Sequence, residues 1–299
     1  MNVKKNKIAR AIFPCVLLAG ILPNTNGSQN PANQPPDSLK TNTLTVIVTD
    51  RDERVVTDLT TADFNVYKDG EPQRILSVSI TDVPACIGIT LDTSRSTRPI
   101  RSVLAAAIYN FVKVSNPDDE TFLVNFNGRA YLDTDFTKDP ERLRDGLSHM
   151  DAQGNTALFD AVIASAAHLA KRPACARRIL LVLSNGRDNA SAKSLQQTLT
   201  ALEQSSGVIV YAIGLSSEQG SGRRALENLT LQTGGVAWFI DNIKDSDKIF
   251  RAAVEQIRHQ YSITYAESNT NSGTNRNITV KVNAAARDGS VVRIIGKQM

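Results

Sequence analysis

The chain has 299 residues, of which 41% are hydrophobic and 21% are charged, as in an ordinary globular protein. This length accommodates one α/β domain of common size and a smaller additional unit. The formal net charge of +4 gives no argument for nucleic-acid binding, because four basic residues near the N-terminus account for it: Lys4, Lys5, Lys7 and Arg10.

Residues 1–28 have the layout of a secretory signal peptide. The basic residues precede an apolar stretch at 11–22, and a polar stretch follows it. The apolar stretch is too short to span a bilayer comfortably, so we predict a removable signal and a secreted or periplasmic protein without membrane contact after signal removal. An uncleaved anchor is the alternative, because no clean Ala-x-Ala site is present. Cys15 lies ahead of the small residues of this segment, so we expect no lipid anchor.

Residues 29–43 are rich in Asn, Pro, Ser and Thr, which predicts a disordered linker. The following segment, 44–84, predicts a small N-terminal β module. It contains strand-like runs, and Asp69-Gly70 provides a turn between two of them. The strand-like runs are 44–49, 64–67 and 74–80.

The stretch Ile87-Gly-Ile-Thr-Leu-Asp92 is an apolar run that ends in an acidic residue. An apolar run without polar alternation predicts a strand buried on both faces, as in a parallel sheet covered by helices. The carboxyl ends of such strands border the crevice in which α/β folds bind ligands. Asp92, Ser94 and Ser96 therefore place a carboxylate and two hydroxyls in one loop, which suits Mg²⁺ or Mn²⁺. A loop that only caps the next helix is the alternative, because Asp and Ser are common turn and cap residues.

Beyond Asp92 the sequence alternates between helical and strand patterns. Six strand-like and six helix-like segments within 85–260 predict a doubly wound, mostly parallel sheet with helices on both faces. The pattern returns to β in residues 261–299. Because these C-terminal strands alone would leave one face bare, we expect them to form a β-sandwich with the module at 44–84.

The loop Asp92-Thr-Ser-Arg-Ser96 resembles the metal-ion-dependent adhesion site of von Willebrand factor A domains. The segment Gly154-Asn-Thr-Ala-Leu-Phe-Asp160 is similar to the one that carries the family's third direct metal ligand, here Thr156. Residues 55–70 resemble the β module that precedes the A domain in exported bacterial relatives. The resemblance implies a Rossmann-like A domain at 85–260. It also implies a cation held directly by Ser94, Ser96 and Thr156, with Asp92 and Asn185 acting through water.

Two residues of this implied site have a further interpretation. Thr156 is also a suitable N-cap for a helix at 157–171. Asn185 follows a strand-like run and stands where the family usually has Asp, so the site departs from the pattern by one negative charge. We expect weaker metal binding as a result, unless Asp188 turns towards the cation.

The resemblance implies a non-enzymatic binding or adhesion protein whose cation takes up an acidic residue of a protein ligand. A divalent-metal-dependent phosphoesterase is the alternative, because a hard cation can activate water or polarise a phosphate. The sequence contains no Gly-x-Ser-x-Gly, His-Glu-x-x-His or Walker motif, and Asp92 is the one sure carboxylate of the loop, which favours binding over catalysis. We expect the histidines in helices, in surface or packing roles: His149, His168 and His259.

Removal of the signal leaves Cys86 and Cys175 as the thiols of an exported protein, an even number that permits a disulfide. The resemblance implies that their strands are parallel neighbours, which makes a bridge feasible. However, Cys86 precedes Asp92 by about six residues and Cys175 precedes Asn185 by about ten, so the chain would have to bend at 174–177. Two free buried thiols are the alternative, and both interpretations stay open.

Overall fold

The computed structural model describes residues 40–80, 82–148, 154–172, 174–205, 207–215, 220–267, 277–283 and 289–295. The predicted signal peptide at 1–28 and most of the predicted linker at 29–43 lie outside these residues. Strand β1 begins at Thr41, so the last residues assigned to the linker are in fact strand. In the part of the chain described, no helix combines the length and apolarity needed to cross a membrane.

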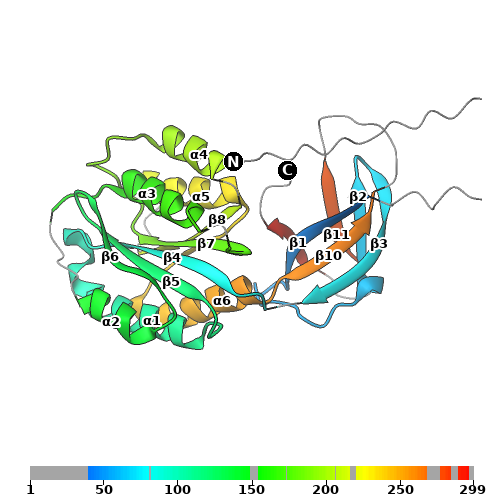
Figure 1. The fold of residues 1–299 in the computed structure, drawn as a ribbon, viewed down its shortest axis with the longest axis horizontal. Coiled ribbons are helices and arrows are strands. Elements are labelled where there is room, and N and C mark those ends of the chain that lie inside the picture. Colours follow the sequence, from blue (N-terminus) through cyan, green and yellow to red (C-terminus); the bar gives the residue numbers. More distant parts are fainter. Residues whose placement is uncertain are drawn as a thin grey trace, which may run out of the picture. The chain divides into compact units, whose positions relative to one another are not determined.

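The central part of the chain is a six-stranded sheet with the order β6-β5-β4-β7-β8-β9 (Figure 1). All neighbouring strands in it are parallel except β5 and β6, which form an antiparallel edge pair. This confirms the predicted doubly wound, mostly parallel architecture. The strands are β4 (Ala85–Asp92), β5 (Glu120–Phe126), β6 (Ala130–Thr137), β7 (Arg177–Ser184), β8 (Val208–Gly214) and β9 (Ala237–Phe239).

Helices cover both faces of this sheet (Figure 1). One apolar core joins one face to the first, second and sixth helices, and a second core joins the other face to the remaining three. All eight residues of β4 are buried, as its unbroken apolar run predicts. The helices are α1 (Arg101–Val114), α2 (Pro140–Ser148), α3 (Leu158–Ala170), α4 (Leu195–Gln204), α5 (Ser221–Thr233) and α6 (Ser246–Arg258).

The two ends of the chain together form an antiparallel β unit with the strand order β11-β2-β3-β10-β1-β12. C-terminal strand β10 lies between N-terminal strands β1 and β3, which confirms that both ends contribute. The strands are β1 (Thr41–Thr49), β2 (Phe64–Lys68), β3 (Glu71–Ile80), β10 (Tyr261–Ala266), β11 (Ile278–Val282) and β12 (Val291–Ile295).

This β unit is the predicted flanking β structure, and its strands are hydrogen-bonded in one continuous order rather than in two separate sheets. The first residues of β3 pair with β2 and the rest of β3 pairs with β10, so the two layers are continuous through this strand. Side chains from β1, β2, β10 and β11 share one apolar core, and the edge strands β11 and β12 approach each other. A strand that bends from one layer into the next is a common way to enclose a core of this kind.

Candidate functional site

The buried carboxylate of Asp92 is the innermost group of the candidate site. Asp92 is the last residue of β4, and its side chain is 1% exposed. Its Oδ1 accepts a hydrogen bond of 2.9 Å from the backbone N–H of Ser94, and its Oδ2 accepts one of 2.7 Å from the hydroxyl of Ser184. Because Ser184 is the last residue of the neighbouring strand β7, this hydrogen bond links the carboxyl ends of two central strands.

No Lys, Arg or His among the described residues forms an ion pair with Asp92. Burial raises the pKa of Asp92, and the hydrogen bonds from Ser94 and Ser184 act in the opposite direction. A buried carboxylate held only by neutral donors carries a large desolvation cost unless a cation compensates it. The environment of Asp92 therefore fits a divalent cation.

Three polar side chains extend from Asp92 towards solvent. The hydroxyl oxygens of Ser94 and Ser96 are 3.1 Å apart, and Nδ2 of Asn185 donates a hydrogen bond of 3.1 Å to Oγ of Ser96. Ser94 is buried, Asn185 is half-buried and Ser96 is exposed. The two loops after β4 and β7 thus form a polar path from the buried carboxylate to the surface.

The loop after β4 is tight because short-range hydrogen bonds fix it at both ends. The backbone N–H and the hydroxyl of Thr93 both donate to the carbonyl of Phe126 at the end of β5. The backbone N–H and the hydroxyl of Thr97 both donate to the carbonyl of Ser94, where a short 3₁₀ helix (Arg95–Ile100) begins. Ser94 and Ser96 are therefore held in one conformation relative to β4.

Gly186 fixes the backbone beside Asn185. Its φ of +77° lies in the left-handed region, which glycine adopts without strain. A Cβ at this position would overlap the carbonyl oxygen of Gly222 in the first turn of α5, and a Cβ at Gly222 would meet the carbonyl oxygen of Asn185 at 2.5 Å. Only a pair of glycines allows α5 to pack this closely against the loop.

Thr156 lies in the loop before α3, and it is not the N-cap of that helix. Helix α3 begins at Leu158, with Ala157 at the N-cap position and no side-chain cap, so the alternative role predicted for Thr156 is wrong. The backbone of Thr156 is bonded to Asn189, whose Oδ1 accepts from the Thr156 N–H at 2.8 Å. The hydroxyl of Thr156 makes no hydrogen bond to another described residue, which leaves its oxygen available to a ligand.

Asp188 does not replace the missing carboxylate at position 185. Its Oδ2 accepts from the backbone N–H of Phe159 at 3.1 Å and from the hydroxyl of Ser191 at 2.5 Å. Asp160 in turn accepts from the backbone N–H groups of Ala192 and Lys193. These bonds fasten the loop after β7 to the first turn of α3, a role that the sequence analysis did not assign to Asp188.

Four of the five predicted ligands form one hydrogen-bonded network: Asp92, Ser94, Ser96 and Asn185. Thr156 joins the same loop region through Asn189, but it makes no hydrogen bond to the other four. Ser184 was not among the residues predicted for the site, although it is a small polar residue at the end of the apolar run of β7. The set offers a carboxylate and hydroxyl groups, whose oxygens are hard donors that fit Mg²⁺ or Mn²⁺.

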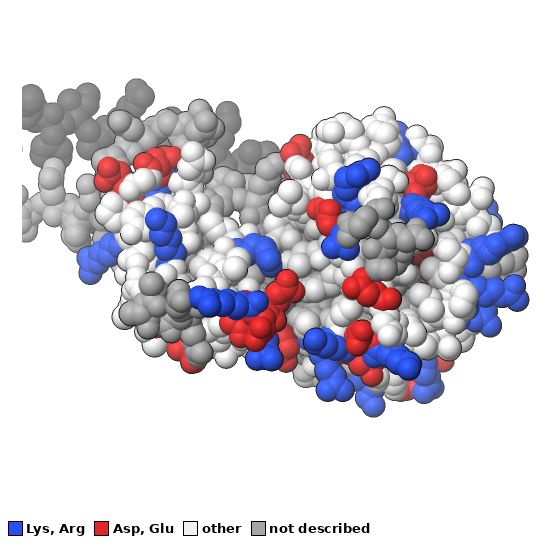
Figure 2. Space-filling model, turned by 180° about the vertical axis from the view of Figure 1, so that it is seen from behind, with Lys and Arg blue, Asp and Glu red and all other residues white. Residues whose placement is uncertain are grey.

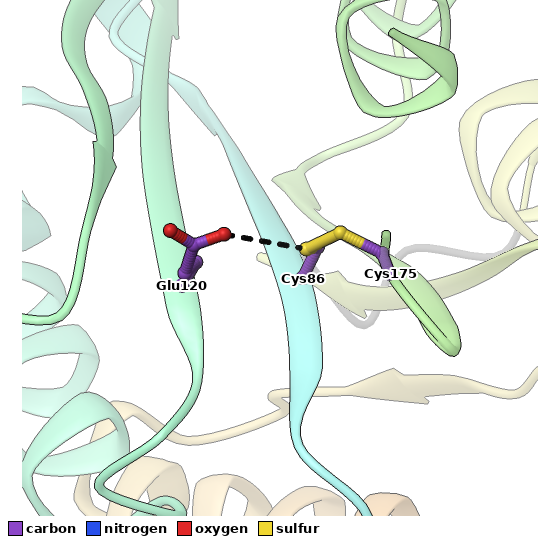
Figure 3. A group of neighbouring side chains, drawn as sticks. All are labelled: Cys86, Glu120 and Cys175. Carbon is purple, nitrogen blue, oxygen red and sulfur yellow. Dashed lines mark hydrogen bonds between the residues drawn. A yellow bond between two sulfur atoms is a disulfide. The ribbon is translucent and has the colours of Figure 1, made fainter. Parts of the chain in front are cut away.

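A second cluster of potential ligands lies at the amino ends of the strands and does not form a metal site (Figure 3). Cys86 and Cys175 form a disulfide with a Cα–Cα distance of 5.8 Å, which resolves the alternatives left open by the sequence. Glu120 lies 4.0 Å from the sulfur of Cys86, but a disulfide sulfur carries no proton to donate, and Arg172 binds this carboxylate at 2.8 Å. The backbone N–H of Cys175 donates to the carbonyl of Arg172 and closes a turn before β7. This turn compensates for the different distances along the chain from each cysteine to the end of its strand.

The family comparison agrees with the fold, and the matched range contains the candidate site. Residues 87–187, which include all five predicted ligands, match the family model of the von Willebrand factor type A domain. Together with the sheet order, this match confirms the resemblance to von Willebrand factor type A domains that the sequence indicated.

Three solved structures illustrate the similarity. A von Willebrand factor type A protein from Catenulispora acidiphila is 11% identical, with a TM-score of 0.52 over 88% of this chain and 74% of that one. Proximal thread matrix protein 1 from the mussel byssus, with a zinc-occupied MIDAS motif, is 17% identical, with a TM-score of 0.52 over 64% of this chain and 50% of that one. The vWF domain of the type V pilus tip protein Mfa5 from Porphyromonas gingivalis is 11% identical, with a TM-score of 0.50 over 59% and 96%. At these identities the similarity establishes the fold alone, and no curated protein matches the sequence.

Proposed function

We propose that the protein is an exported, non-enzymatic binding module that uses a divalent cation to bind an acidic residue of a protein ligand. In this proposal residues 1–28 are a signal peptide, 29–43 link it to the β unit formed by 44–84 and 261–299, and 85–260 carry the cation site. Ser94, Ser96 and Thr156 bind Mg²⁺ or Mn²⁺ directly, and Asp92 and Asn185 act through water.

The observation that carries the proposal is the buried charge of Asp92. The carboxylate has neutral donors and no basic partner among the described residues, and it is connected to solvent through Ser94 and Ser96. A cation bound there supplies positive charge that the protein itself does not provide. Because Ser96 is exposed, a carboxylate from another protein could reach a cation held by these hydroxyls.

Two of the structurally similar proteins support this assignment. One contains a zinc-occupied MIDAS motif, and another is the tip protein of a pilus. They make cation-dependent binding at a cell surface the first function to test. On the face shown in Figure 2, basic and acidic side chains are interspersed rather than gathered into a basic stripe, so this face offers no continuous surface for a nucleic-acid backbone.

Calorimetric titration with Mg²⁺ and Mn²⁺ tests the cation site. We expect saturable binding to the wild type and loss of binding in the double variant Ser94→Ala/Ser96→Ala. Ser102→Ala is the matched control, because Ser102 is an exposed hydroxyl in the first turn of α1 without a hydrogen bond to the described residues. Absence of binding to the wild type at millimolar cation would refute the site.

Capture of a ligand from envelope extract, with and without EDTA, tests the binding role. We expect the chelator to abolish capture by the wild type, and we expect Ser94→Ala/Ser96→Ala to capture nothing in either condition. A phosphate-ester assay with Mn²⁺ tests the alternative function, a phosphoesterase. Turnover that is present in the wild type and lost in Asp92→Ala would show a phosphoesterase instead.

A further inference from the structure

Asn185 presents a hydrogen-bond donor to the candidate cation site. Its Oδ1 accepts a hydrogen bond of 3.0 Å from the backbone N–H of Arg187 within the same loop. This bond determines the orientation of the amide, because a backbone N–H requires an acceptor opposite it. Nδ2 therefore points to the other side, where it donates to Oγ of Ser96.

A donor at this position is unsuited to a cation and suited to an oxyanion. An N–H group does not bind a metal ion, and it competes for the Ser96 oxygen that would do so. The amide nitrogen has a second hydrogen that no described residue accepts, and Asn185 is half-buried. A carboxylate that reaches the cation with one oxygen can accept this hydrogen with the other.

The net charge of the site also favours an anionic ligand. With a dication bound, Asp92 leaves one positive charge uncompensated, whereas a second carboxylate at position 185 would make the site neutral. A site with net positive charge attracts an anionic ligand more strongly and holds the cation more weakly.

We infer that Asn185 selects for an anionic ligand at the expense of metal affinity, so that the divalent cation and a carboxylate bind cooperatively. The Nδ2–H of Asn185 donates a hydrogen bond to the ligand. Because position 185 carries no carboxylate, the site with a bound dication keeps one positive charge, which the ligand neutralises. This inference rests on the proposed cation site. It adds that each of the two partners, cation and carboxylate, raises the affinity for the other by the same factor.

The test compares Mn²⁺ affinity, measured by the relaxation of water protons, in acetate and in chloride at equal ionic strength. Acetate serves as the carboxylate probe, and its effect on free Mn²⁺ is measured without protein and subtracted. We expect wild-type Mn²⁺ affinity to be higher in acetate than in chloride. We expect Asn185→Asp to bind Mn²⁺ more tightly in chloride, on the order of thirtyfold, which corresponds to a dication and a unit negative charge about 4 Å apart in water. In this variant acetate should give little or no further increase.

Asn185→Ala separates the hydrogen bond from the charge. This variant has the same charge as the wild type but no donor, so we expect a reduced effect of acetate. Ser102→Ala should behave as the wild type, and circular dichroism confirms that each variant is folded.

The outcomes distinguish the inference from the proposed function. If the wild type binds Mn²⁺ equally in both salts, the inference is overturned while the cation site stands. The same conclusion follows if Asn185→Asp retains the full effect of acetate. If the wild type binds Mn²⁺ in neither salt, the cation site and the inference both fail.

Discussion

The hydroxyl of Ser184 donates a hydrogen bond of 2.7 Å to Oδ2 of Asp92, and both residues are buried. Each is the last residue of its strand, so this bond joins the carboxyl ends of β4 and β7. The hydroxyl of Ser184 also accepts from the backbone N–H of Gly186 at 3.0 Å, which connects the carboxylate to the loop that carries Asn185. Ser184 therefore positions both sides of the candidate site.

Ser184→Ala should lower the free energy of unfolding by about 1–3 kcal/mol, because it leaves Oδ2 of the buried carboxylate without a donor. It should also weaken Mn²⁺ binding, because Asp92 is no longer held in position. Urea denaturation without metal and a Mn²⁺ titration measure the two effects. Ser165→Ala is the control: Ser165 accepts a buried hydrogen bond of 2.8 Å from Thr90 away from the site. It should lose stability but keep its Mn²⁺ affinity, and an equal loss of affinity in both variants would contradict the positioning role.

The disulfide between Cys86 and Cys175 should contribute about 4 to 5 kcal/mol to stability in the chain-entropy model, because its cysteines are 89 residues apart. Denaturant unfolding of the oxidised protein and of Cys86→Ser/Cys175→Ser measures this contribution. Thiol counting on denatured, unreduced protein lacking the predicted signal peptide should find no free thiol. Two free thiols per chain would contradict the bridge.

Arg258 forms a buried ion pair with Asp119, and both side chains are nearly inaccessible to solvent. Asp119 also accepts a hydrogen bond of 2.7 Å from the backbone N–H of Ala85 at the start of β4. Arg258→Met should cost about 3–5 kcal/mol of unfolding free energy, because it leaves a buried charge without its partner. Arg251→Met, at an exposed position of the same helix, should change stability little. Similar losses of unfolding free energy in both variants would show that the replacement of Arg by Met in this helix, rather than the ion pair with Asp119, causes the loss.

Glu267 gives the β unit a defined response to acid. A hydrogen bond from Lys68, and a second one from Asn42, lower the pKa of Glu267 from its ordinary value of 4.5 to about 2. Because the pKa is lower in the folded state, this stabilisation is complete above about pH 4.5 and is lost as the pH falls towards 2. Glu267→Gln should therefore flatten the decline of unfolding free energy in this interval. Glu71→Gln, at an exposed glutamate of β3, should leave the decline unchanged. An unchanged slope in Glu267→Gln would show that other groups set the acid response.

The sequence predicts the parts of this protein that depend on local patterns. The apolar run before Asp92 determines a buried strand, and polar residues at its end must lie at the carboxyl edge of the sheet. The position of Asn185 follows from the same argument for β7. The loss of one charge at this site is also evident in the sequence.

Contacts between distant loops are not predicted in this way. The hydrogen bonds between the loop after β7 and the first turn of α3 join residues about thirty positions apart, and they arise only when both segments are placed by the sheet. The same holds for Cys86 and Cys175, whose distance depends on a turn that the strand pattern does not specify. The continuity of the β unit through β3 depends on where this strand changes partners, and its sequence contains no break at that point.

Anomalous diffraction from a crystal soaked in Mn²⁺ tests the proposed cation site, because it locates the cation without assuming its ligands. We expect one anomalous peak within coordination distance of the hydroxyl oxygens of Ser94, Ser96 and Thr156. We also expect water between the ion and Asp92, and the Nδ2 of Asn185 directed towards an anion or water on the ion. A peak elsewhere in the protein, or no peak at saturating Mn²⁺, would contradict the proposed cation site.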